Sequence, residues 1–189
     1  MIQTDSLGEL QELYLSLQSQ MRERWNRDLP FEELLFDRWE RAKRLGFGEN
    51  ASIYHNSYVY GEVKVGKNTW IGPYTLLDGT GGLIIGDWCC ISSNVHIYTH
   101  DTVNRFVSGG QEPTEYAPVI IEDNCYIGPH SLIKSGVTIH HHCVIGASTF
   151  VNKDIPAYSI AVGTPAKVIG KVSYDEKGKL IYLYDKGTK

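Results

Sequence analysis

The chain has 189 residues, a formal net charge of −4 and a pI near 6.0. This length allows one domain with a substantial core, and the mildly acidic charge excludes the broad basic surface of a nucleic-acid-binding protein. The first ten residues do not resemble a signal peptide and no stretch approaches the roughly 20 apolar residues of a membrane span, so we expect a cytoplasmic protein.

Residues 1–50 are predicted to form an N-terminal helical cap. Ser6 and Glu9 fit a capping box at a helix start, and the apolar residues that follow recur at helical spacing. A second helix is expected to begin near Pro30 and to end near Gly46. Because this segment lies outside the repeat that follows, we expect it to cover one open end of the body.

A six-residue period runs through residues 51–171. An aliphatic residue occupies the first position of each unit, and a period of six fits neither a helix nor a simple strand. The series is Ile53, Val59, Val65, Ile71, Leu77, Ile85, Ile91, Ile97, Ile121, Ile127, Ile133, Ile139, Ile145 and Val151. A two-residue insertion at "GTGG" follows Leu77, and residues 103–120 form an excursion after Ile97.

Three such units would close one coil of a triangular prism, with one unit on each face. The first and fifth positions then point inward, and the Gly, Asp, Asn, Lys and Pro residues between them suit the corners. Stacked coils pair their backbone edges about 4.8 Å apart, and each coil contacts only its neighbours. The sequence therefore predicts a mainly β fold, a parallel β-helix in the form of a triangular prism.

The segment "IHHHCV" at residues 139–144 contains the ligand types that zinc binds. The six-residue frame instead assigns His140–His142 to a corner, where we expect their side chains to point outward and to diverge. Cys143 takes the fifth, inward position, as do Cys89 and Cys125, so these thiols are expected to be reduced and to fill the core. We therefore predict no metal site.

Residues 172–189 are predicted to form a short C-terminal tail or hairpin. The sequence "YDEKGKLIYLY" alternates on both sides of a turn at Glu176–Gly178.

Several motifs carry a family resemblance. The six-residue units, together with "IYTHD", "PVIIEDNCYIGPHSLI" and "VNKDIPAYSIAVGTPAKVIG", resemble the hexapeptide-repeat acyltransferases. The resemblance is closest to sugar O-acetyltransferases of the galactoside, maltose and surface-polysaccharide type, and it covers about residues 51–171. It implies a left-handed parallel β-helix, a homotrimer with active sites between neighbouring prisms, and acetyl-CoA as the acyl donor.

His100 stands where the excursion begins, and long loops inserted in a regular solenoid are usually functional. A hydroxyl is a poor nucleophile until a base takes its proton, and histidine, with an ordinary pKa of about 6.5, suits that task. By the resemblance, His100 is the catalytic histidine. The alternative is a loop histidine paired with Asp101.

The resemblance also implies a set of residues that bind the acyl donor. The set comprises Tyr126, Gly128, Pro129, Ala147, Asn152, Lys153 and Lys167. Small residues would let the pantetheine approach the backbone, and the lysines would meet the phosphates. Pro129 and Asn152 depart from the residues that the family more often has at these places.

The acceptor is expected to contact three residues near His100. Asp78 and Tyr74 lie beside the "GTGG" insertion, and His96 would help to orient the acceptor. For Asp78 the alternative is the cap of a plain glycine-rich turn.

Together these inferences predict an acetyl-CoA-dependent transfer of acetyl to a hydroxyl of a sugar or glycan precursor. N-acetylation of a nucleotide-linked amino sugar is an open alternative. A zinc-dependent hydratase of the γ-carbonic-anhydrase type would need three converging histidines. A non-catalytic scaffold is the remaining alternative, and the intact "THD" and "GTPAKVIG" motifs count against it.

Overall fold

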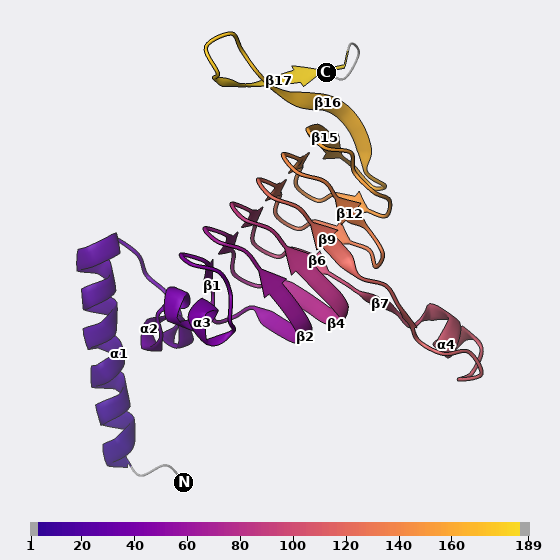
Figure 1. The fold of residues 1–189 in the computed structure, drawn as a ribbon. Coiled ribbons are helices and arrows are strands. Elements are labelled where there is room, and N and C mark those ends of the chain that lie inside the picture. The colour runs from indigo at the N-terminus through magenta and orange to yellow at the C-terminus, as the bar shows by residue number, and fades with distance from the viewer. Residues whose placement is uncertain (1–3, 186–189) are drawn as a thin grey trace.

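The computed structural model describes residues 4–185, whose body is a stack of coils with helices at one end and a hairpin at the other (Figure 1). The helices in this part of the chain are α1 (Thr4–Trp25), α2 (Phe31–Leu35), α3 (Arg38–Arg44) and α4 (Val103–Val107). Each of these helices is too short or too polar to cross a bilayer.

The coils have three faces, each made of parallel strands stacked above one another. Face 1 consists of β1 (Ser52–Ile53), β3 (Trp70–Ile71), β5 (Cys90–Ile91), β10 (Tyr126–Ile127), β13 (Val144–Ile145) and β15 (Ser159–Val162). The long strands β2 (Tyr58–Val65) and β4 (Leu76–Ile85) pass from face 2 to face 3. Face 2 continues with β6 (His96–Ile97), β11 (Leu132–Ile133) and β14 (Phe150–Val151), and face 3 with β9 (Val119–Ile121) and β12 (Thr138–Ile139).

The strand register confirms the six-residue frame. On face 2, Leu77 pairs with Ile97, Ile97 with Ile133, and Ile133 with Val151. The equivalent residues of the other two faces pair in the same way, and all of the predicted aliphatic series is buried except Val59, which is partly buried. The first positions of the units therefore form the core, and the predicted parallel β-helix is confirmed.

The inward position of the cysteines is also confirmed. Cys89, Cys125 and Cys143 are buried, and each thiol donates to a backbone carbonyl of a neighbouring coil. The S···O distances are 3.1, 3.2 and 3.0 Å, respectively. These thiols therefore act as small core residues with a satisfied S–H group.

The N-terminal segment differs from the predicted pair of helices. α1 already includes Ser6, so this residue lies within a helix and does not cap its start. The second helix is divided because the Asp37 carboxylate accepts hydrogen bonds from the backbone N–H groups of Trp39 and Glu40, which starts α3 anew. Arg41 on α3 then donates to backbone carbonyls of the first coil and holds the cap on the stack.

The excursion leaves the stack at the end of face 2. β7 (His100–Asp101) pairs antiparallel with β8 (Glu115–Tyr116), and α4 lies between them in sequence. Figure 1 shows α4 projecting away from the coils. The chain re-enters the stack with β9, so Val119 and Ile120 belong to a coil.

The last two strands of the described residues form an antiparallel hairpin that begins at Lys167. β16 (Lys167–Tyr174) pairs antiparallel with β15 and with β17 (Leu180–Tyr184). At the turn, the Asp175 carboxylate accepts hydrogen bonds from the backbone N–H groups of Lys177 and Lys179. Lys167 therefore belongs to the hairpin and not to the last coil.

Candidate functional site

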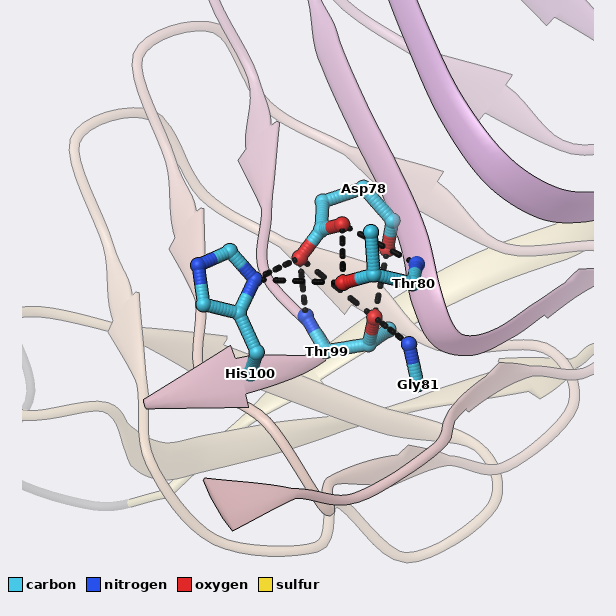
Figure 2. Close-up of polar contacts among 5 residues, drawn as sticks. All are labelled: Asp78, Thr80, Gly81, Thr99 and His100. Atoms are coloured by element: carbon cyan, nitrogen blue, oxygen red, sulfur yellow. Dashed lines mark hydrogen bonds and ion pairs between the residues drawn. The ribbon is translucent and has the colours of Figure 1, made fainter. Parts of the chain in front are cut away.

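His100 is paired with Asp78, as Figure 2 shows, and the distance from His100 Nδ1 to Asp78 Oδ2 is 2.6 Å. Asp78 follows Leu77 at the corner between faces 2 and 3. Because Leu77 pairs with Ile97, the Asp78 carboxylate lies beside the segment that leads into His100. The neighbouring carboxylate, Asp101, accepts instead from the backbone N–H of Val103.

Two threonines hold the buried Asp78 carboxylate. Thr80 donates its backbone N–H and its hydroxyl to Oδ1, at 3.0 and 2.7 Å, and the Thr99 backbone N–H donates to Oδ2 at 3.0 Å. Burial alone would raise the pKa of Asp78, but these bonds and the one from His100 outweigh burial and lower it to about 2. Asp78 is therefore ionised at any pH at which the protein would work.

The ionised carboxylate determines the tautomer of His100. A carboxylate only accepts hydrogen bonds, so the proton between the two side chains belongs to His100 Nδ1. In the neutral ring, Nε2 then carries a free lone pair, and Figure 2 shows this nitrogen pointing away from Asp78. The arrangement can accept a proton from a group that approaches Nε2.

A cavity of about 430 Å³ adjoins His100 on face 2. It is lined by Tyr98, His100, Asp101, Thr102, Leu132, Lys134, Ser135 and Phe150. Leu132 and Phe150 are paired across β11 and β14, so they form an apolar wall that continues from one coil to the next. Lys134 adds a cation to the rim.

Leu132, Lys134 and Phe150 did not stand out in the sequence. Leu132 and Phe150 each precede the aliphatic residue of a face 2 unit, and Lys134 follows one. The sequence signal for these three residues is their outward position in units of face 2, the face that ends at His100.

Within one chain, the seven residues predicted to bind the acyl donor do not meet at this cavity. Asn152 and Lys153 follow Val151 and so share the corner between faces 2 and 3 with Asp78. Lys167 begins β16 in the hairpin. Tyr126 lies on face 1 and lines a separate groove of about 240 Å³ against the hairpin.

Gly128, Pro129 and Ala147 lie at the corner between faces 1 and 2. A Cβ atom at Gly128 would lie 2.6 Å from the backbone nitrogen of Ala147. The close stacking of the coils therefore requires this glycine, whether or not a ligand approaches it.

The three predicted acceptor residues have different surroundings. Asp78 is 1 % exposed and faces His100, so it has no surface to offer an acceptor. Tyr74 is exposed at the corner between faces 1 and 2, the opposite edge of face 2 from His100. His96 lies on face 2, and the Tyr98 ring stands 6.2 Å from His96 and 6.3 Å from His100, between centroids.

The histidine run occupies a corner, as predicted, but its side chains do not all diverge. His142 has a φ of 58°, like Asn124 in the coil before it with 61°. His141 Nδ1 and His142 Nδ1 are 3.1 Å apart, because both rings pack on Tyr158. In residues 4–185, no three His, Cys, Asp or Glu side chains are grouped so that they could hold a metal ion.

Replacing all of His140–His142 by Asn is expected to leave turnover close to that of the unmodified protein. Asparagine tolerates the left-handed backbone of His142, and this corner lies between faces 3 and 1, whereas His100 follows face 2. The lost Tyr158 packing and the bond from His140 to Glu122 should lower the free energy of unfolding by only about 1 kcal/mol. Turnover measured with and without a chelator checks this, and a chelator-induced loss that zinc restores would contradict it.

The chain resembles known proteins both in sequence and in structure. Residues 118–153 match the family described as bacterial transferase hexapeptide (six repeats). Galactoside O-acetyltransferase of Escherichia coli (strain K12) is 33% identical over 141 residues, which are 73% of this chain and 68% of that protein. A putative acetyltransferase of Staphylococcus aureus (strain Mu50) is 37% identical over 113 residues, which span only 57% of its length.

Two crystal structures extend the likeness over most of the chain. Maltose O-acetyltransferase from Clostridium difficile 630 has 31% identity and a TM-score of 0.63, covering 87% of this chain and 88% of that one. A hexapeptide-repeat acetyltransferase from Vibrio cholerae, complexed with acetyl coenzyme A, has 25% identity and a TM-score of 0.63, covering 85% and 87%. The repeat, the fold and these likenesses together show that the chain belongs to the bacterial hexapeptide-repeat transferase family.

Proposed function

We propose that this protein transfers an acetyl group from acetyl-CoA to a hydroxyl of a sugar or glycan precursor. The observation that carries the proposal is the pairing of His100 with the buried, ionised Asp78 beside an open cavity. The galactoside and maltose acetyltransferases among the similar proteins support a sugar acceptor, and the V. cholerae complex supports acetyl-CoA as the donor.

His100 acts as the general base in a direct transfer. Its Nε2 takes the proton of the acceptor hydroxyl while the hydroxyl oxygen forms a bond to the thioester carbonyl carbon. The C–S bond then breaks, and the imidazolium returns the proton to the departing thiolate. Asp78 holds Nδ1–H in place and stabilises the imidazolium, so it is a positioning residue and does not contact the acceptor.

The cavity is the proposed place for the arm of the donor. Leu132 and Phe150 give an apolar wall along which an extended pantetheine can lie, and Lys134 at the rim can meet a phosphate. Asn152 and Lys153 lie at the corner between faces 2 and 3, one coil beyond Lys134. A homotrimer, in which a neighbouring prism closes the open side of this cavity, completes the proposed site.

The proposed location is the cytoplasm. All four cysteines are free thiols, which fits a reducing compartment.

The experiment that tests the function is an acceptor screen that follows thiol release from acetyl-CoA. We expect release with mono- or disaccharides that carry free hydroxyls, and mass spectrometry should show one added acetyl ester. An acetyl amide on a nucleotide-linked amino sugar would contradict O-acetylation, although the protein would still be an acetyltransferase. No release with any hydroxyl or amine acceptor would reject both, and a monomer with full activity would reject the trimeric site.

A further inference from the structure

The last strand of the protein has an open edge. Within residues 4–185, β17 pairs with β16 and with no other strand, and Figure 1 shows it at the end of the stack. Its sequence, "LIYLY", has no charge and no proline, and four of its five side chains are more than 40 % exposed. Natural edge strands usually carry charges or proline that block pairing, so this edge is suited to receive another strand.

The hydrogen bonds of the hairpin show which residues face the open edge. The Asp185 backbone N–H donates to the Ile169 carbonyl, and the Asp175 N–H donates to the Lys179 carbonyl. Because bonded pairs alternate along an antiparallel ladder, Ile181 and Leu183 also bond to β16. The N–H and C=O groups of Leu180, Tyr182 and Tyr184 therefore point to the open edge.

This edge is complementary to an inverted copy of itself. When two β17 strands meet antiparallel with Tyr182 opposite Tyr182, Leu180 lies opposite Tyr184 in both halves. Leu180, Tyr182 and Tyr184 of both strands then turn their N–H and C=O groups toward each other, which allows on the order of six backbone hydrogen bonds. The same register puts Lys179 of each strand opposite Asp185 of the other, so unlike charges meet at both ends.

We propose that β17 pairs with β17 of a second copy of the chain and joins the two hairpins into one continuous antiparallel sheet. The contact is two-fold, and three such contacts around one three-fold axis would link two trimers of the proposed kind into a closed six-chain particle. It depends on the hairpin alone and is independent of the chemistry at His100.

The first test changes one backbone donor. Tyr182→Pro removes an N–H that points to the open edge and leaves the ladder to β16 intact, whereas Tyr182→Thr removes the same ring but keeps the N–H. Light scattering should give half the unmodified particle mass for the proline variant and the full mass for the threonine variant. Equal masses for all three proteins would overturn the proposal, and so would a halved mass for both variants.

The second test reads the register by disulfide formation. In a Cys90→Ser background, the Ile181→Cys and Leu183→Cys variants should form a linked dimer when mixed, because these positions face each other as a non-hydrogen-bonded pair with Cα atoms about 4.5 Å apart. Neither variant should link to itself, because its two cysteines would be offset by two residues along the strands. Self-linking of a single variant, or no link in the mixture, contradicts the two-fold register.

Discussion

His100→Ala is expected to lower turnover by about 10²–10⁴-fold, the usual contribution of a positioned general base. This corresponds to roughly 3–5 kcal/mol in the activation free energy. The affinity for acetyl-CoA should hardly change, because the apolar wall of Leu132 and Phe150 and the cation of Lys134 remain. Steady-state turnover and equilibrium binding of acetyl-CoA, measured on the same preparation, check both halves of this expectation.

Two controls separate a missing base from a damaged fold. Added imidazole should restore part of the turnover of His100→Ala, because it can occupy the space of the lost ring. His130→Asn changes another histidine, at a corner with a φ of 61° that asparagine tolerates, and should keep full turnover. Near-normal turnover in His100→Ala would reject the base, and loss of acetyl-CoA binding would make His100 a structural residue.

Asp78→Asn is expected to lower turnover by a similar factor, about 10²–10⁴-fold, through the tautomer of His100. If the amide NH₂ faces Nδ1, the ring must carry its proton on Nε2 and can no longer act as a base. If the NH₂ group instead takes the place of Oδ1, it points at the backbone N–H of Thr80, so that two hydrogen-bond donors face each other. Either orientation leaves a buried backbone donor without an acceptor, so the free energy of unfolding should also fall by about 1–3 kcal/mol.

Asp101→Asn is the matched control, since Asp101 adjoins His100 in sequence but bonds to the backbone N–H of Val103. Its turnover should stay close to that of the unmodified protein. If Asp101→Asn were the more damaging change, the pairing of Asp78 with His100 would be the wrong description of the site.

The effect of Asp78 on stability should depend on pH in a defined direction. Folding lowers its pKa from the ordinary value of 3.8 to about 2, so its ionised form stabilises the folded state. This contribution is complete above roughly pH 4–5 and is lost as the pH falls toward 2. Denaturant unfolding of the unmodified protein and of Asp78→Asn should therefore differ less at acid pH, and a constant difference would contradict the ionised state.

The sequence was sufficient to predict the stack because every coil obeys the same rule. An inward position accepts only compact or aliphatic side chains, so residues such as Ile97 and Cys125 reveal the frame. The start of the excursion likewise stood out against this regular background, and with it His100.

The repeat pattern does not predict contacts that depend on the direction of individual side chains. The sequence indicates Asp78 as a site residue, but its contact with His100 depends on how β4 and β6 align across the "GTGG" insertion. The outward histidines were wrongly expected to diverge because the Tyr158 ring, which holds two of them together, belongs to another coil. Outward positions such as Phe150 follow no compositional rule, so the wall of the cavity was missed.

Asp78 and His100 belong to successive coils, so their separation along the prism is set by the rung spacing of the sheet, about 4.8 Å. The backbone ladder therefore sets the distance between the two coils, and the bonds from Thr80 and Thr99 fix the direction of the Asp78 carboxylate. Heating should consequently leave the alignment unchanged until the ladder between these two coils opens, and activity should then disappear over the same narrow temperature range as the local β-structure.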